Sequence, residues 1–219
     1  MRIIDAEVDF CQVDKDSLYK AIERAGRTCY KSEDKITDES AKRFVAGIVK
    51  RGHEAMLEHA SVTAKFIVDR GVSHEIVRHR MASYAQESTR YCNYAKEQFN
   101  GEITVIKPLF FADGTRAYET WKSCCEEAEK AYFDLLEIGF LPEEARTVLP
   151  TSLKTEIIVT MNLREWRHFL RLRAAGTTGK PHPQMREVAM KALSFMREEM
   201  PEVFGDIYEF AKENGYAKA

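Results

Sequence analysis

Long apolar runs are missing from the 219-residue sequence. No stretch approaches the roughly 18 consecutive apolar residues that a membrane-spanning helix needs. The first ten residues, MRIIDAEVDF, alternate charged and apolar side chains and contain no apolar core of a signal peptide. We therefore expect neither a signal peptide nor a contact with a membrane.

Cysteine is scarce and irregularly spaced. The chain contains five cysteines, an odd number, and no two of them form a C-x-x-C pair. This pattern argues against a disulfide framework and against a zinc site built on cysteine. Free thiols of this kind are typical of a reducing compartment, so we expect a cytoplasmic protein.

An excess of either charge is also missing. The formal net charge is −2, with 44% apolar and 31% charged residues, which is ordinary for a folded globular protein. Bulk charge therefore gives no reason to expect a partner as anionic as a nucleic acid. Any site for an anion must be local. The length fits a single domain over residues 1–219 that ends in helices.

The apolar periodicity predicts an α+β fold with a small mixed or antiparallel sheet and several packed helices. Strands are expected over 3–10, 62–68 and 156–161, and a long helix is expected to end at Gly139. Ser73 is the expected cap of a short helix, and residues 81–114 are expected to be rich in loops. Asn162 and Glu165 have the spacing of a capping box for a helix through about residue 173.

Glycine-rich phosphate loops are absent as well. The sequence has neither G-x-G-x-x-G nor G-x-x-x-x-G-K-S/T, so backbone cradles of the Rossmann or P-loop type are excluded. If the protein binds a nucleotide, side chains must hold its phosphates. Arginine is the best candidate, because its planar fork can donate two parallel hydrogen bonds to one phosphate.

Arginines are concentrated in two segments. In the first, Arg78-His79-Arg80 is followed after seven residues by Ser88 and then by Arg90. Adjacent side chains cannot all project the same way from a helix, so Arg78 and Arg80 should address different regions. The alternative is a solvated surface segment that pairs with nearby glutamates.

The second arginine-rich segment is NLREWRHFLRLR, residues 162–173. Its expected buried stripe is Leu163, Trp166 and Leu170, which leaves Arg164, His168 and Arg171 on another face, with Arg173 near the end. Cations near the C-terminus of a helix can simply complement its dipole. That explanation fails for Arg164, which lies in the first turn, so an anionic ligand is favoured.

Three other functions could be inferred from individual residues of the sequence. His53 and His59 could hold a metal, but they are six apart rather than four, so they diverge on a helix. Ser88 could be a nucleophile, although it lacks the G-x-S-x-G elbow. A nucleic-acid-binding module could use the aromatic rings of Tyr84, Tyr91 and Tyr94 as stacking platforms.

The sequence resembles the flavin-dependent thymidylate synthase family, whose signature R-H-R-x7-S matches Arg78 to Ser88. The similarity extends through four further motifs in the expected order: GHE at 52–54, ASYAQESTRY at 82–91, EEARTVLP at 143–150 and NLREWRHFLRLR at 162–173. It therefore covers most of the chain.

The resemblance implies an enzyme that converts dUMP to dTMP. The implied carbon donor is 5,10-methylenetetrahydrofolate, and the implied reductant is NADPH, acting through bound FAD. It also implies a homotetramer whose active sites are shared between subunits, and it implies no metal and no nucleic acid.

Roles for single residues also follow from the resemblance. The implied cofactor-binding residues are His53, Ala55, Arg78, His79, Arg80, Gln86, Asn162, Leu163, Arg164 and His168. The implied substrate-binding residues are Glu75, Arg78, Gln86, Glu87, Ser88, Thr89, Arg90, Arg146 and Arg173. At position 75 the chain has Glu where glutamine is common in the family.

The expected chemistry differs from that of folate-only thymidylate synthases, which use a Pro-Cys nucleophile. This chain contains no Pro-Cys dipeptide. A fixed guanidinium at the N3/O4 edge of the uracil would instead stabilise the negative charge that makes C5 nucleophilic. The resemblance gives this role to Arg173. Ser88 is the other candidate catalytic residue, and we interpret it as a hydroxyl that binds the substrate.

Overall fold

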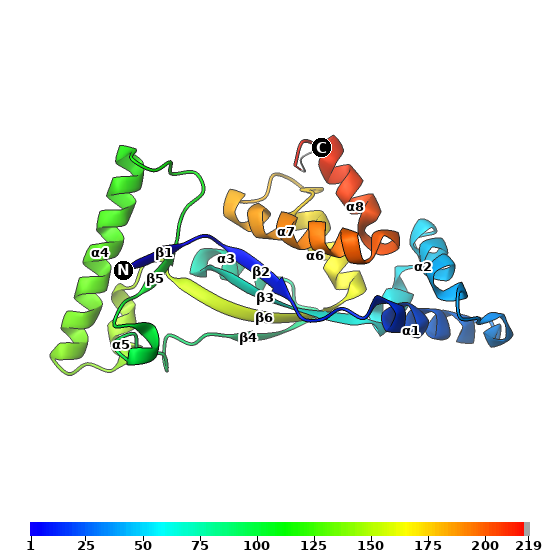
Figure 1. Ribbon diagram of the computed structural model, residues 1–219, viewed down its shortest axis with the longest axis horizontal. Helices are drawn as coiled ribbons and strands as arrows, with labels where there is room; N and C mark the ends of the chain where they lie inside the picture. Colours follow the sequence, from blue (N-terminus) through cyan, green and yellow to red (C-terminus); the bar gives the residue numbers. More distant parts are fainter. Residues whose placement is uncertain (217–219) are drawn as a thin grey trace. The chain divides into compact units, whose positions relative to one another are not determined.

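The computed structural model describes residues 1–216 and confirms the α+β class (Figure 1). Its strands are β1 (Arg2–Ile4), β2 (Glu7–Phe10), β3 (Ser61–Asp69), β4 (Ala82–Gln86), β5 (Thr104–Ile106) and β6 (Lys154–Asn162). Its α-helices are α1 (Lys15–Thr28), α2 (Ser40–Lys50), α3 (Arg70–Ile76), α4 (Arg116–Glu137), α5 (Pro142–Ala145), α6 (Leu163–Arg173), α7 (Pro183–Glu199) and α8 (Pro201–Glu213). Short 3₁₀ helices are η1 (Glu33–Lys35), η2 (Glu54–His59), η3 (Glu97–Phe99) and η4 (Arg146–Val148). Among the described residues, no helix combines the length and the apolar character needed to cross a membrane.

The chain forms two compact units. Unit 1 contains Met1–Glu7, Phe66–Arg78 and Ala85–Ile157, and unit 2 contains Val8–Lys65, His79–Tyr84 and the chain from Ile158 onward. The single domain expected over 1–219 remains a prediction beside this division, and its last three residues, 217–219, lie outside the described part of the chain.

Unit 1 is built around a parallel pair of short strands. β1 pairs with β5 in the register Arg2↔Thr104 to Ile4↔Ile106. Unit 1 also contains a buried apolar cluster that includes Val105 of β5. Its members are Tyr94, Ile103, Val105, Cys125, Tyr132, Ala145 and Leu153. The helix α4 begins after Thr115, whose hydroxyl accepts a hydrogen bond from the N–H of Tyr118.

Unit 2 contains the helices α1, α2, α6, α7 and α8. The expected buried stripe of α6 is confirmed, because Leu163, Trp166 and Leu170 are fully buried. Trp166 donates its indole N–H to the carbonyl of Val62 on β3, at 3.0 Å. Its ring also packs against Phe10 of β2, with 5.7 Å between the ring centroids. These contacts hold α6 on the strands.

The other sheet has the strand order β2-β3-β6-β4. In β3 and β6 buried and more exposed residues alternate, as the period of two in their sequences predicts. The strand β6 leads directly into α6 through Asn162, whose side-chain oxygen accepts a hydrogen bond from the N–H of Glu165 at 2.8 Å. The predicted cap of this helix is thereby confirmed.

Residues 81–114 are rich in loops, as expected, although they also contain the short strands β4 and β5. Two other local expectations were wrong. The predicted strand over 3–10 is divided into β1 and β2. Ser73 lies inside α3, which is capped by Asp69 through a hydrogen bond from the N–H of Val72 at 2.8 Å. A buried aspartate can accept that bond as well as a serine can, so residue type alone could not decide between them.

Candidate functional site

The predicted site residues that the structure brings together fall into three groups, two in unit 2 and one in unit 1. We call them the Thr89 cluster (Ser88, Thr89, Arg90, Glu143 and Arg146), the His79 cluster (His79, Glu165, His168 and Arg173) and the His53 cavity, which is lined by residues of α1, α2 and η2 and by Arg164.

The Thr89 cluster brings together two of the arginines predicted to bind substrate. Arg146 donates from Nη1 to Thr89 Oγ1 at 3.3 Å and from Nε to the backbone carbonyl of Glu143 at 3.2 Å. Arg90 forms an ion pair with the carboxylate of the same glutamate. Ser88 Oγ accepts a hydrogen bond from the N–H of Arg90 at 3.2 Å. Two guanidinium groups and two hydroxyls therefore surround one short segment, which suits a phosphate.

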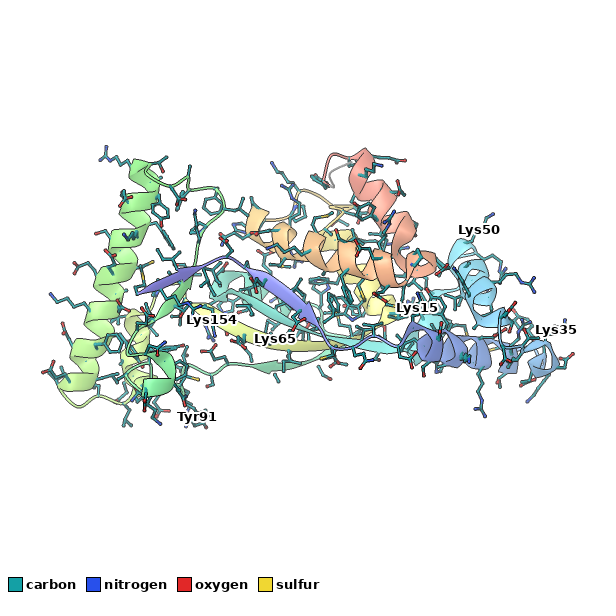
Figure 2. The ribbon with its side chains drawn as sticks, in the orientation of Figure 1. Lys15, Lys35, Lys50, Lys65, Tyr91 and Lys154 are labelled. Atoms are coloured by element: carbon teal, nitrogen blue, oxygen red, sulfur yellow. The ribbon has the colours of Figure 1, made fainter. Side chains whose placement is uncertain are left out.

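Gln86 and Glu87 are directed elsewhere in unit 1. Gln86 donates to Ser73 Oγ at 3.0 Å and to Thr155 Oγ1 at 3.2 Å. The carboxylate of Glu87 accepts a hydrogen bond from Lys154 Nζ on β6 at 2.9 Å (Figure 2). Neither side chain is joined to the Thr89 cluster by these contacts, so a role in binding substrate stays a prediction for both.

The His79 cluster is centred on a buried histidine. His79 is 4% exposed, whereas Arg78 and Arg80 on either side are exposed, so the three adjacent side chains do not share one environment. Arg173 donates from Nε to His79 Nε2 at 3.2 Å. Burial, together with the positive charge of Arg173 and the proximity of His168, lowers the pKa of His79 to about 4. At neutral pH this histidine is therefore uncharged.

Glu165 and His168 complete this cluster. Glu165 Oε1 lies 3.4 Å from His79 Nδ1, and burial raises the pKa of Glu165 against the opposing effect of His168. The ring of His168 lies 5.6 Å from that of His79. Among residues 1–216, these three side chains are the one group whose ligand atoms are close enough to hold a metal, within 4.8 Å of one another. His53 and His59, the pair considered from the sequence, do not belong to it.

The His53 cavity has a volume of about 630 Å³. It brings together three residues predicted to bind cofactor, namely His53, Ala55 and Arg164. Its apolar lining comes from Phe44, Ile48 and Met56, and its cationic lining also includes Arg27, Lys35 and Arg51. An apolar floor with several cations is suited to a large planar ring that carries phosphate or carboxylate groups.

Two predicted cofactor residues beside this cavity are used by the fold. Leu163 is fully buried, and its N–H donates to the carbonyl of Ala60 at 2.9 Å. The side-chain oxygen of Asn162 caps α6. Arg164 is exposed and forms an ion pair with Glu58 of η2. Of these three residues, Arg164 is the one whose side chain the structure brings to the cavity.

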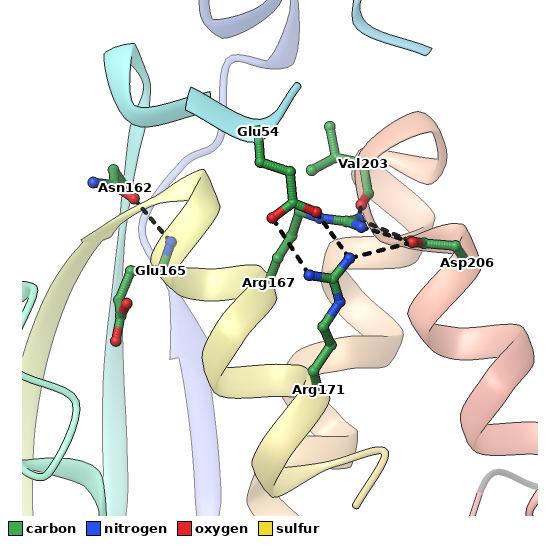
Figure 3. A network of polar contacts seen from close by, with 7 residues as sticks. All are labelled: Glu54, Asn162, Glu165, Arg167, Arg171, Val203 and Asp206. Carbon is green, nitrogen blue, oxygen red and sulfur yellow. Dashed lines mark hydrogen bonds and ion pairs between the residues drawn. The ribbon is translucent and has the colours of Figure 1, made fainter. Parts of the chain in front are cut away.

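A buried ion network that the sequence analysis missed holds the cavity wall. Arg167 is 1% exposed, and it bonds to Glu54 Oε1 at 2.9 Å, to both carboxylate oxygens of Asp206 at 2.8 and 2.6 Å, and to the carbonyl of Val203 (Figure 3). Arg171 also bonds to Glu54, at 2.8 Å.

Charge complementarity stabilises this network. Burial alone would raise the pKa of Glu54, but hydrogen bonds and charges from Arg171 and Arg167 outweigh it and lower that pKa.

A signal for this network was present in the sequence, because Arg167 is four residues after Leu163 and three before Leu170, which places it on the buried stripe. A buried arginine requires a carboxylate partner.

The stacking platforms proposed for nucleic acid are not available as a set. Tyr94 is 4% exposed, and Tyr84 donates its hydroxyl to the backbone carbonyl of His79. Tyr91 is exposed, in the loop after β4 (Figure 2). A module that stacks bases on these three rings is therefore excluded.

Comparisons with known proteins find relatives that match most of the chain. A chain from Corynebacterium aurimucosum named flavin-dependent thymidylate synthase is 34% identical, over 94% of this chain and 85% of the relative. Chains of the same name from Geobacter sulfurreducens and Pyrococcus abyssi are 33% and 39% identical, over 85% and 74% of this chain and 80% and 65% of those relatives.

The fold is also found among solved structures. A UMP/dUMP methylase, PolB, from Streptomyces cacaoi, solved bound with 5-Br dUMP, matches with a TM-score of 0.76 at 22% identity, over 95% of this chain and 97% of that one. The family model described as thymidylate synthase complementing protein matches residues 13–202. The fold and site thus define an enzyme with an α+β architecture. This chain belongs to the flavin-dependent thymidylate synthase family, as the sequence motifs predicted.

We expect the substitution Arg167→Met to lower the free energy of unfolding by about 3–5 kcal/mol, because it leaves the carboxylate of Glu54 without a buried partner. Urea denaturation measures this change. The control is Lys42→Met, which removes a surface ion pair of 3.2 Å with Glu202 from a side chain that is 73% exposed. That substitution should cost less than about 1 kcal/mol. Equal losses for the two variants would contradict a special role for the network.

Proposed function

We propose that this protein catalyses the reductive methylation of dUMP to dTMP with bound FAD. The proposed carbon donor is 5,10-methylenetetrahydrofolate, the proposed reductant is NADPH, and no cysteine acts as nucleophile. We further propose a cytoplasmic homotetramer with active sites shared between subunits. The observation that supports the proposal is the grouping of predicted residues into one cluster of arginines and hydroxyls and one large cavity with a cationic lining, in a chain of this family.

The Thr89 cluster is the proposed site of the substrate phosphate. Arg90 and Arg146 would donate to its oxygens, and Ser88 and Thr89 would add hydroxyl donors. Glu143 forms an ion pair with Arg90, and a bound phosphate would replace Glu143 as the partner of that guanidinium. Bidentate donation to a phosphate would give affinity and would fix the far end of the nucleotide.

The His53 cavity is the proposed site of the cofactor, and its lining fits FAD. The apolar side chains would contact a ring system, and Arg27, Lys35 and Arg164 would neutralise a pyrophosphate. When bound, the flavin supplies the hydride chemistry, and the protein supplies orientation and electric field. His53 lines the same cavity, so it can contact both the flavin and a folate bound beside it.

Arg173 is the proposed activating group. Its guanidinium would lie at the N3/O4 edge of the uracil, where negative charge must develop for C5 to become nucleophilic. The contact of its Nε with His79 involves a neutral imidazole, so this contact orients the guanidinium without adding a negative charge. Preorganised charge of this kind lowers the barrier most when it needs no rearrangement.

The thiols give support to a mechanism without cysteine. Cys125 is buried and Cys92 partly so, and burial raises the pKa of both thiols, which disfavours the reactive thiolate. No cysteine follows a proline in the sequence. The proposed activation therefore depends on arginine rather than on covalent attack.

The function is tested by incubating the purified protein with FAD, dUMP, 5,10-methylenetetrahydrofolate and NADPH. We expect the yellow flavin colour to bleach on addition of NADPH. We also expect dTMP to form, and chromatography measures its amount. Omission of FAD or of the folate should stop dTMP formation. A colourless protein that does not bind FAD and makes no dTMP would refute the proposal.

The substitution Arg173→Ala should abolish dTMP formation, with a loss of at least about 100-fold in kcat, because the charge that stabilises the transition state is removed. The protein should still melt at nearly the same temperature and still bind FAD. Turnover is measured as dTMP produced per minute. A rate near that of the unmodified enzyme would remove Arg173 from its proposed role.

The substitution Ser88→Ala should raise KM for dUMP while kcat falls by less than about tenfold, because a phosphate contact contributes to binding in ground and transition states alike. Ser88 Oγ accepts from a backbone N–H, which cannot take up the proton that a nucleophilic serine must lose. A completely inactive Ser88→Ala variant that still binds dUMP would instead favour covalent catalysis.

A further inference from the structure

The His79 cluster contains a chain of three side chains, in which a carboxylate faces one nitrogen of a buried imidazole and a guanidinium bonds to the other. Arg173 Nε lies 3.2 Å from His79 Nε2, and Glu165 Oε1 lies 3.4 Å from His79 Nδ1. Although this second distance falls within ion-pair range, its geometry does not complete a hydrogen bond, and Nδ1 is left as a buried polar atom without a bonded partner.

The contact with Arg173 indicates which tautomer of His79 is present. A guanidinium has only donors, so His79 Nε2 must accept through its lone pair. The depressed pKa of His79, caused first by burial and then by the charge of Arg173, keeps the ring neutral. A neutral imidazole with a lone pair on Nε2 carries its proton on Nδ1. That N–H faces the carboxylate of Glu165.

Other contacts restrain the ring and the carboxylate. The ring of Phe169 packs edge-on against His79, with 4.9 Å between centroids and an angle of 75°. Tyr84 donates its hydroxyl to the backbone carbonyl of His79. Glu165 lies in the first turn of α6, where its own N–H is bound by Asn162 at 2.8 Å (Figure 3). Its side chain is 12% exposed, so water competes little for the carboxylate.

We propose that Glu165 is a positioning residue for the reaction, which acts through His79 to hold the guanidinium of Arg173 in the orientation that catalysis needs. The inference rests on the proposed function, because it takes Arg173 as the group that activates the pyrimidine. Neither the family match nor the resemblance assigns a role to Glu165. A contact of 3.4 Å is longer than a normal hydrogen bond, and such contacts often shorten when substrate binds.

The physical reason is the choice between two tautomers. With Glu165 present, the carboxylate favours the proton on Nδ1 and leaves Nε2 as an acceptor for Arg173. Without it, the proton can move to Nε2, where its N–H would face the N–H of Arg173. Two donors cannot bond to each other, so the guanidinium would lose this restraint and rotate. In serine proteases the loss of the orienting aspartate has the same type of effect on the catalytic histidine.

The kinetic test compares Glu165→Ala with Glu165→Gln. Glutamine keeps a side-chain oxygen that can accept from Nδ1–H, whereas alanine does not. We expect Glu165→Ala to lower kcat for dTMP by about 10- to 100-fold, the range found when orienting partners of histidine are removed elsewhere. KM for dUMP and the rate of flavin reduction by NADPH should each change by less than about threefold, and the melting temperature should stay nearly the same. Glu165→Gln should recover most of kcat.

The control is Glu209→Ala, which removes an exposed glutamate from α8 in the same unit and should leave all of these quantities unchanged. Glu165→Ala with at least half of the normal kcat would overturn the inference. Equal damage from alanine and glutamine, with flavin reduction falling in parallel, would also overturn it, because that pattern indicates a merely structural role.

A second measurement does not depend on turnover. In protein labelled with ¹⁵N-histidine, NMR should show His79 with its proton on Nδ1 at pH 7, and Glu165→Ala should shift the population toward protonated Nε2. A histidine that is protonated on Nε2 in the unmodified protein, or one whose tautomer does not respond to Glu165→Ala, would refute the inference. If instead the tautomer behaves as expected and no dTMP forms with the unmodified protein, the proposed function fails and the positioning contact stands.

Discussion

The guanidinium of Arg167 is enclosed within unit 2, and the local arrangement of three segments depends on how it is neutralised. A buried charge without partners would cost far more than a small domain can supply. Glu54 provides one carboxylate from η2, and Asp206 provides another from α8. Because the buried guanidinium of Arg167 bonds to both carboxylates, η2, α6 and α8 are held relative to one another.

This constraint has a functional consequence for the residues beside it. Glu54 lies between His53 and Ala55, which line the cavity, and Arg167 lies three residues after Arg164, which lines the same cavity from α6. Glu54 itself also lines the cavity, so the bond from Arg167 holds one part of the cavity wall in place. The bond between Arg167 and Glu54 therefore stabilises the fold and also supports the wall of the proposed cofactor site.

The helix α6 combines the two roles through its periodicity. Residues 163, 166, 167 and 170 form the buried stripe, and 164 and 168 point away from it. Burial of the stripe holds the helix rigidly, because Trp166 is packed and hydrogen-bonded on β3. The backbone at the exposed positions is thereby held in place, so only the rotamers of their side chains remain to be ordered by a ligand.

Elements with strong local signals were predictable from the sequence. The strand β6, the cap at Asn162 and the stripe of α6 follow from alternation, capping spacing and the 3.6-residue period, and all three are confirmed. The burial of His79 between two exposed arginines was not predicted, because adjacency shows that the side chains diverge but not which of them is buried. The short strands β4 and β5 were missed because three to five residues give too little alternation to recognise.

The partners of buried charges could not be predicted, because they are set by distance in space rather than in sequence. Arg167 meets Asp206, 39 residues away, and His79 meets Arg173, 94 residues away. Nothing in the local pattern of Glu165 distinguishes a capping-box glutamate from one that faces an imidazole. Its N–H bond to Asn162 was foreseen, whereas its contact with His79 required the coordinates.

Two of the proposed functional arginines, Arg90 and Arg173, differ in how they are held, and the difference matches their proposed tasks. Arg90, whose side chain is 56% exposed, forms an ion pair with the carboxylate of Glu143. An incoming phosphate competes with that carboxylate for the same guanidinium, so the pair can open to bind substrate and close again after release. Such an exchange suits a group that contributes to affinity.

Arg173 is oriented by a lone pair of a neutral ring, and an imidazole does not compete electrostatically with an anionic ligand as a carboxylate does. The contact can therefore persist while negative charge develops on the pyrimidine. A group that must stabilise a transition state gains most from a restraint of this type, because the guanidinium need not break one bond before it makes another. The depressed pKa of His79 is thus part of the same device, since a protonated ring would repel Arg173 and remove the restraint.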